Sequence, residues 1–362
     1  MSSLGRPKSE YRSAQHGGTP VSAQQVERFE LAPGYVIPRL IRGGWQLAGD
    51  HGAVDRARAI ADMAAFVAAG IDVFDCADIY TGVEDMIGSF RAEQAGLRVH
   101  TKFVPDLADL AKVDEAYARR IIERSMQRLR ATQLNLVQFH WWDYAMPGML
   151  ETAHHLAALQ REGRIAHLGG TNFDTPHTAQ MLDAGISLVS MQVQYSLLDR
   201  RPAGALSALC ASSKLRLICY GTIAGGFITE AWLGQAEPNA LQNRSLIKYK
   251  LVIDEFGGWA RFQQLLQLLQ RIGARHGVSL SAVATRWVLD QPHVAATIVG
   301  ARYAAHLPEH LQVFSFQLDA RDHAELAALL AQCPGPQGDT YALERDRNGP
   351  HGSIMKYNLS KV

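Results

Sequence analysis

The chain has 362 residues, of which 47% are hydrophobic and 20% are charged, and its formal net charge is +1. This length accommodates either two ordinary domains or one large barrel-type domain, and the apolar fraction is sufficient for a sizeable core. The near-neutral charge gives no reason to expect a nucleic-acid or membrane-surface partner, so we expect the partner to be a small molecule.

The cysteines and the hydropathy pattern exclude further classes of protein. The four cysteines form no Cys-x-x-Cys pair and share no regular spacing with histidines, so the sequence predicts neither a disulfide framework nor a metal site. Residues 1–18 are polar and lack the apolar core of a secretory signal. No segment approaches the roughly 18 apolar residues of a membrane helix. We therefore expect a cytoplasmic protein, whose oligomeric state the sequence leaves open.

In chain order, residues 1 to about 30 lack hydrophobic periodicity and are interpreted as an N-terminal extension. Eight short apolar runs follow, at residues 40–45, 71–75, 98–103, 134–140, 165–169, 188–193, 215–220 and 296–299. Segments of helical period separate most of them, for example at residues 55–69, 114–129, 149–162 and 262–275. Short apolar strands that alternate with helices are typical of a parallel sheet covered on its faces. Eight such units without a Pro/Ser-rich linker predict one α/β domain over residues 31–332, a single (β/α)8 TIM barrel.

Two segments depart from this alternation. Residues 221–258, after the seventh strand, are too long for an ordinary barrel loop, and we expect them to cover the active site. Residues 333–362 form a polar C-terminal tail with glycine and proline but no periodicity. The tail is either disordered or wrapped onto the barrel, and the sequence leaves both alternatives open.

Polar side chains follow three neighbouring predicted strands at their C-terminal ends, where the reacting groups of such barrels lie. Asp75 and Tyr80 follow the second strand, Lys102 ends the third, and His140 ends the fourth. A nearby ammonium lowers the pKa of tyrosine from roughly 10, and a carboxylate holds the lysine charged and in place. The four together therefore predict a proton donor, although each alone could be a helix cap, a packed ring or a solvated charge.

One of these segments, FDCADIYTGVEDMIG, is similar to the pattern F-D-x-A-x-x-Y-x-x-x-E-x-x-[IL]-G of the aldo-keto reductase family. The resemblance extends over about residues 38–332 and implies a nicotinamide cofactor and hydride transfer between its C4 atom and a carbonyl carbon. It also implies that Asp75, Tyr80, Lys102 and His140 are the catalytic residues, with Tyr80 as the proton donor.

Further segments resemble the cofactor-binding segments of this family. GRIAHLGGTNF implies that Thr171 and Asn172 bind the nicotinamide carboxamide, and MQVQYSLLDRR adds Gln194 as a third contact. LICYGTIAGGF implies that Tyr220 stacks on the nicotinamide and that the backbone of the following turn cradles the pyrophosphate. That turn consists of Gly221, Thr222, Ile223, Ala224, Gly225 and Gly226. LIRGGWQLAG implies that Gly43, Gly44 and Trp45 lie against cofactor and substrate.

The segment after the eighth strand, IVGARYAAHLPEH, departs from the family pattern. Gly300 and Ala301 replace the Lys-Ser pair with which many members bind a 2′-phosphate. Arg302 is the compensating candidate, because a guanidinium suits a phosphate. The remaining expected adenosine contacts are His306, Glu309 and His310. We expect NADP(H) to be preferred, and NAD(H) is not excluded.

The leading hypothesis is an NADPH-dependent reductase of aldehydes or ketones, reversible toward alcohol oxidation. Trp45, Trp141 and Trp142 are expected to line a pocket for an aromatic or bulky substrate. One alternative is a redox-linked regulatory or binding protein like the β subunits of potassium channels, which share the fold and the four catalytic residues. A second alternative, reached without the family, is a Schiff-base aldolase that uses Lys102.

Overall fold

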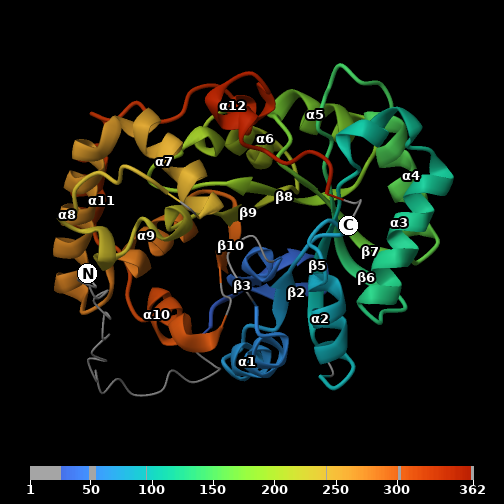
Figure 1. Ribbon diagram of the computed structural model, residues 1–362, viewed down its shortest axis with the longest axis horizontal. Coiled ribbons are helices and arrows are strands. Elements are labelled where there is room, and N and C mark those ends of the chain that lie inside the picture. The colour runs from blue at the N-terminus through green and yellow to red at the C-terminus, as the bar shows by residue number, and fades with distance from the viewer. Residues whose placement is uncertain (1–25, 49–53, 95, 242, 301–302, 360–362) are drawn as a thin grey trace, which may run out of the picture.

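The computed structural model describes residues 26–48, 54–94, 96–241, 243–300 and 303–359 (Figure 1). Its centre is a closed barrel of eight parallel strands in the order β10-β3-β4-β5-β6-β7-β8-β9. The strands are β3 (Leu40–Gly43), β4 (Val73–Asp75), β5 (Arg98–Phe103), β6 (Leu134–Phe139), β7 (Ile165–Thr171), β8 (Leu188–Gln194), β9 (Arg216–Tyr220) and β10 (Val294–Gly300). Each strand overlaps one of the predicted apolar runs, so the predicted (β/α)8 barrel is confirmed.

Helices surround the barrel and connect its strands (Figure 1). They are α1 (Arg56–Ala68), α2 (Val83–Arg91), α3 (Glu115–Arg128), α4 (Met149–Arg161), α5 (Thr175–Asp183), α6 (Ala205–Ser212), α7 (Arg244–Phe256), α8 (Gly258–His276), α9 (Leu280–Leu289), α10 (Leu307–Leu311) and α11 (Ala320–Leu330). Asp55, Asp114 and Asp174 begin α1, α3 and α5, where each carboxylate accepts a hydrogen bond from the N–H three residues later. Within the described ranges, no helix combines the length and apolar character needed to span a bilayer.

The strands are apolar on both sides because each side faces a different part of the core. Ile41, Val73 and Leu136 belong to the cluster inside the barrel, whereas Phe74 belongs to the larger cluster beneath the helices. Side chains two residues apart on a strand point the same way. Asp75 therefore follows Val73 on the inside of the barrel, at the end where the strand finishes.

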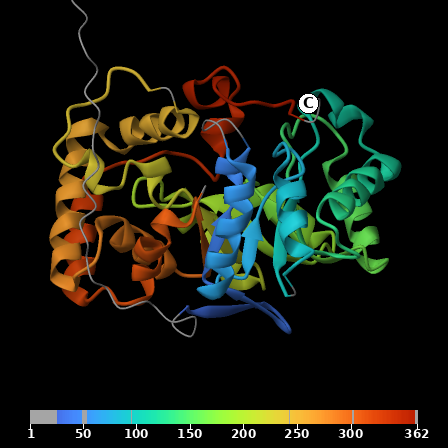
Figure 2. The same ribbon diagram turned by 60° about the horizontal axis from the view of Figure 1, so that its bottom comes forward.

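The opposite end of the barrel carries a hairpin that the sequence analysis did not predict. Strands β1 (Arg28–Ala32) and β2 (Tyr35–Pro38) pair antiparallel, and Figure 2 shows them in dark blue below the barrel. Leu31, Tyr35 and Ile37 are buried against the interior cluster, so the hairpin closes this end. Residues 28–30, assigned above to the N-terminal extension, thus belong to β1, while residues 1–25 of that extension lie outside the described part of the chain.

The end where the strands finish is covered by two segments from the second half of the chain. The long segment after β9 contains α7, and the C-terminal tail contains the short helices α12 (Ala342–Arg345) and α13 (Pro350–Ser353). Arg345 donates to the carbonyl oxygens of Trp141, Trp142 and Asn172 at 2.6, 2.8 and 2.8 Å. Of the two alternatives for the tail, the structure therefore shows the one in which it is wrapped onto the barrel, over residues 333–359.

The packing between the barrel and α1 generates a prediction about stability. Arg42 is fully buried between the rings of Phe66 and Phe74, with its guanidinium carbon 5.2 and 5.0 Å from their centroids. Burial lowers the pKa of Arg42 to about 10, and its three side-chain nitrogens have no hydrogen-bond partner within the described residues. Because an unpartnered buried charge is costly, we expect Arg42→Met to raise the free energy of unfolding by about 1 kcal/mol or more.

Urea denaturation measures this change, and Arg39→Met is the matched control. Arg39 donates to Glu27 and to the carbonyl oxygens of Val294 and Ala295, so its loss should lower stability. A lower stability of Arg42→Met than of the parent chain would show that the two rings stabilise the guanidinium by more than its burial costs.

Candidate active site

A cavity of about 710 Å³ opens at the end of the barrel where the strands finish. Most of the site residues predicted from the sequence line it: Gly43, Trp45, Asp75, Tyr80, Lys102, His140, Trp142, Thr171, Asn172, Tyr220, Gly221, Thr222, Ile223, Gly225, Gly226, Gly300, His306, Glu309 and His310. The volume is within the usual range for a small-molecule site. The predicted contacts Ala301 and Arg302 lie outside the described residues.

The floor of the cavity contains a buried ion pair between Lys102 and Asp75. The Lys102 Nζ atom lies 2.7 Å from Asp75 Oδ2 and also donates to the carbonyl oxygen of Cys76 at 2.8 Å. The other oxygen of Asp75 accepts hydrogen bonds from the side chains of Gln138 and Gln192. Burial disfavours the charge on Lys102, but Asp75 and Tyr80 together outweigh this effect, so the pKa of Lys102 is raised and the ammonium is retained.

Tyr80 lies between this ion pair and the ring of Trp45. Its ring centroid is 5.4 Å from Lys102 Nζ and 5.0 Å from the Trp45 ring. Burial raises the pKa of Tyr80 to about 12, and the opposing effect of Lys102 is smaller. The expected lowering by the lysine is therefore present but outweighed. Tyr80 keeps its proton at neutral pH and can donate it to a ligand.

His140 is neutral, and its tautomer is determined by the backbone. Burial, together with Arg345, lowers the pKa of His140 to about 3. Its Nδ1 atom lies 2.9 Å from the carbonyl oxygen of Thr171, which can only accept, so Nδ1 carries the hydrogen. The Nε2 atom is then a bare acceptor, and it has no hydrogen-bond partner within the described residues.

Two side-chain amides lie near Tyr220, where the sequence analysis expected the nicotinamide. Asn172 Oδ1 accepts from the Tyr220 hydroxyl at 2.9 Å. Gln194 Nε2 donates to Asp199 at 2.7 Å, and its Oε1 atom is buried without a partner in the described part of the chain. The Gln194 amide oxygen is an acceptor and the Asn172 amide nitrogen is a donor, which are the two kinds of group that a carboxamide pairs with.

The turn expected to cradle the pyrophosphate has only some of its N–H groups available. Those of Ala224 and Gly226 donate within the turn, to the carbonyl oxygens of Gly221 and Ile223. The sequence analysis did not identify Arg244 and Lys248 of α7, which line the same cavity and add positive charge. The packing of α7 on the turn is close, since a Cβ atom on Gly225 would lie 3.2 Å from Ser245 Cβ.

At the end of the cavity expected to hold the adenosine, a carboxylate and an imidazole form a pair. His306 Nδ1 lies 3.7 Å from Glu309 Oε2, and the Ser281 hydroxyl donates to the other oxygen at 2.5 Å. These contacts raise the pKa of His306 and lower that of Glu309 to about 2. His310 is held neutral, because burial lowers its pKa to about 4.

Four predicted residues do not line the cavity: Gly44, Trp141, Gln194 and Ala224. Trp141 is fully buried, and its indole N–H donates to the carbonyl oxygen of Met146 at 3.2 Å. Because neighbouring residues on an extended segment point to opposite sides, an inward His140 turns Trp141 outward. The expected substrate contact of Trp141 is therefore corrected. Gly44 allows close packing of β3 on β4, since a Cβ atom there would lie 2.8 Å from the Asp75 carbonyl oxygen.

Within the described residues, the only group of three side chains with metal-binding geometry is His276, Asp319 and Asp322. None of the three lines the cavity. Both carboxylate oxygens of Asp322 are already paired, with Arg275 and His276 at 2.6 Å each. This group is an ion-pair network at the start of α11.

Comparison with known proteins agrees with this architecture. The chain is similar to the aldo-keto reductase YhdN of Bacillus subtilis, with 24% identity over 310 residues, which are 82% of this chain and 91% of the relative. It is also similar to a 6-dehydroglucose reductase of Agrobacterium fabrum, with 24% identity over 84% of this chain and 98% of the relative. The structure of a glycerol dehydrogenase from Gluconobacter oxydans shares the fold, with a TM-score of 0.73 and 23% identity. The match covers 87% of this chain and 98% of the dehydrogenase chain.

The sequence model of the Aldo/keto reductase family matches residues 39–331, which include every strand of the barrel. Members of this family are oxidoreductases that use nicotinamide cofactors. The match extends over most of the chain, from β3 to the end of α11, and thus includes the residues at the floor of the cavity. The chain therefore belongs to the aldo-keto reductase family.

Proposed function

We propose that this chain is an NAD(P)H-dependent reductase of aldehydes or ketones that also catalyses the reverse oxidation of alcohols. The observation that carries the proposal is the Lys102–Asp75 ion pair, 2.7 Å long, beneath the buried phenol of Tyr80 at the wall of the cavity. A protonated phenol beside a fixed ammonium can release its proton, because the ammonium stabilises the phenolate that remains. Tyr80 is thus the proton donor of the proposed reaction.

In the proposed mechanism, the Tyr80 hydroxyl donates a hydrogen bond to the carbonyl oxygen and then transfers its proton. Lys102 stabilises the resulting phenolate, and Asp75 keeps Lys102 charged and in place. The nicotinamide, when bound, supplies the hydride to the carbonyl carbon. The Nε2 atom of His140 can accept but not donate a hydrogen bond, so Tyr80 polarises the carbonyl.

The cofactor would be held by residues at three places in the cavity. The amide of Asn172 suits the carboxamide, and Tyr220 suits the face of the nicotinamide ring. Gln194 does not line the cavity, so it is not included in this set. The cations Arg244 and Lys248 suit the pyrophosphate, next to the glycine-rich turn. At the adenosine end, Arg302 is the proposed partner of a 2′-phosphate, and NADPH is the proposed preference.

The two alternative functions have less support. A Schiff-base lysine must react as the neutral amine, whereas Asp75 keeps Lys102 charged. A redox-linked regulatory protein would retain the same four residues, so turnover decides that alternative. Steady turnover well above the rate of cofactor release supports an enzyme, and a single slow turnover supports a regulatory protein.

The first prediction concerns the proton donor. Tyr80→Phe retains the ring but removes the hydroxyl, so carbonyl reduction should fall by about 10²-fold or more. Cofactor affinity, measured by fluorescence titration, should change little. Tyr117→Phe is the matched control, because Tyr117 lies on α3 outside the cavity and its hydroxyl has no proposed role. A Tyr80→Phe variant that keeps most of its activity would assign the proton donor to another group.

The second prediction concerns the charge of Lys102, which lowers the pKa of Tyr80 against the effect of burial. Lys102→Met removes this charge, so the pKa of Tyr80 should rise further. Alcohol oxidation requires the phenolate, and its rate should therefore be lower at every pH and should keep rising to higher pH than in the parent chain. The pH profile of residual activity measures this shift. A profile of unchanged shape contradicts the role of Lys102. A borohydride-trapped imine on Lys102 of the parent chain supports the aldolase.

The third prediction concerns the choice of cofactor. A charge-assisted hydrogen bond is worth roughly 1.5–3 kcal/mol, so Arg302→Ala should weaken NADPH binding by about 10- to 150-fold and leave NADH nearly unchanged. Glu309→Gln removes the carboxylate beside His306 and should shift the affinity ratio toward NADPH. Fluorescence titration of each variant with each cofactor measures the ratios. Equal loss of both cofactors in Arg302→Ala would remove the basis for an NADPH preference.

A further inference from the structure

Tyr341 in the C-terminal tail has a backbone conformation that bulky residues rarely adopt. Its φ angle is 62°, in the left-handed region. Strained residues of this kind persist only where the surrounding structure holds them, and they gather at functional sites. Asn172 and Ala224, at the cavity and next to it, share this conformation. The conformation of Tyr341 therefore indicates a functional position.

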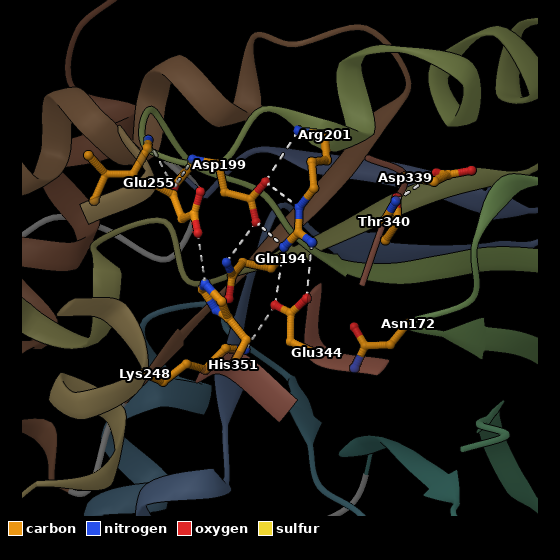
Figure 3. A network of polar contacts seen from close by, with 12 residues as sticks. Asn172, Gln194, Asp199, Arg201, Lys248, Glu255, Asp339, Thr340, Glu344 and His351 are labelled. Atoms are coloured by element: carbon orange, nitrogen blue, oxygen red, sulfur yellow. Dashed lines mark hydrogen bonds and ion pairs between the residues drawn. The ribbon is translucent and has the colours of Figure 1, made fainter. Parts of the chain in front are cut away.

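Polar anchors hold the tail on both sides of Tyr341, and Figure 3 shows the one that follows it, between Glu344 and Arg201. Before it, the Asp339 carboxylate accepts hydrogen bonds from the backbone and side chain of Thr175 at 2.9 and 3.0 Å. After it, the Glu344 carboxylate accepts hydrogen bonds from both terminal nitrogens of Arg201 at 3.0 and 3.1 Å. Arg201 in turn pairs with Asp199 at 2.7 Å, and all three charged side chains are nearly fully buried. These contacts hold Tyr341 in one position.

The position of Tyr341 is beside the catalytic residues of the proposed mechanism. The residue is 4% exposed and lines the cavity, and its ring lies 5.8 Å from the His140 ring in an edge-to-face arrangement. Tyr341 and Tyr80 line the same cavity. The hydroxyl of Tyr341 makes no hydrogen bond to the described residues.

The hydrogen-bonding roles of Tyr341 and His140 are complementary. Burial raises the pKa of Tyr341, so its hydroxyl is protonated and can donate. His140 Nε2 can only accept, because Nδ1 is committed to Thr171. A simple carbonyl substrate accepts from Tyr80 and leaves the buried Nε2 atom unpaired, which is costly. A hydroxyl group is at once a donor and an acceptor, so it satisfies both Nε2 and the Tyr341 hydroxyl.

We propose that Tyr341 and His140 together bind a hydroxyl on the carbon next to the reacting carbonyl, so that the preferred substrates are α-hydroxy aldehydes and ketones. Tyr80 then donates to the carbonyl oxygen while the adjacent hydroxyl lies between Tyr341 and His140. This inference rests on the proposed reductase function. In this proposal, Tyr341 determines substrate specificity, and the buried anchors of the tail position Tyr341.

The test compares substrates that differ by a hydroxyl in place of a methyl group. Two such pairs are glycolaldehyde with propanal and hydroxyacetone with butanone. The parent chain should prefer the hydroxylated member by about 10-fold in kcat/KM, the value of one to two hydrogen bonds. Tyr341→Phe keeps the ring and the buried anchors but loses the hydroxyl. Its preference should fall to about 2-fold or less, with kcat/KM for the deoxy substrate nearly unchanged.

Tyr357→Phe is the matched control, because Tyr357 lies in the same tail and its hydroxyl donates to the Gly352 carbonyl oxygen outside the cavity. This variant should keep the full preference for the hydroxylated substrates. The inference is overturned if the parent chain shows no such preference, or if Tyr341→Phe retains it or loses activity equally on both members of a pair. If the parent chain reduces no carbonyl with either cofactor, the proposed function fails first.

Discussion

The carboxylate of Asp75 joins four strands of the barrel at the end where they finish. It belongs to β4 and accepts hydrogen bonds from Lys102 of β5, Gln138 of β6 and Gln192 of β8. A carboxylate buried in the barrel is tolerated only when both oxygens are satisfied, and here each of them is. These hydrogen bonds hold the floor of the cavity in one arrangement, and the ring of Tyr80 lies against it, 5.4 Å from Lys102 Nζ.

The fold and the floor of the cavity could be predicted because they follow from local periodicity. Apolar runs identify the strands, and the two-residue repeat then places Asp75 and Lys102 inside the barrel. The same repeat, applied strictly, separates His140 from Trp141, which the sequence analysis had placed together at the substrate. The hairpin β1–β2 was missed, although the Pro-Gly pair at residues 33–34 is a turn signal.

The upper walls of the cavity could not be predicted, because they come from segments without periodicity that fold back from far along the chain. Lys248 reaches the cavity from the cover after β9, and Tyr341 reaches it from the tail. The protonation states also depend on this cover, since burial keeps Tyr80 protonated and His140 neutral. Which of these side chains donates a hydrogen bond and which accepts one therefore depends on burial, which only the three-dimensional structure determines.

The path of the tail has a practical consequence for protein production. Leu359 lines the cavity and its N–H donates to Asp106 at 2.8 Å, while the carbonyl oxygen of Tyr357 accepts from the N–H of Leu107. Only three residues would separate Leu359 from an affinity tag fused after Val362. The hairpin, which the chain enters from its N-terminal side, lies at the other end of the barrel. A C-terminal fusion should therefore be removed before kinetic measurements.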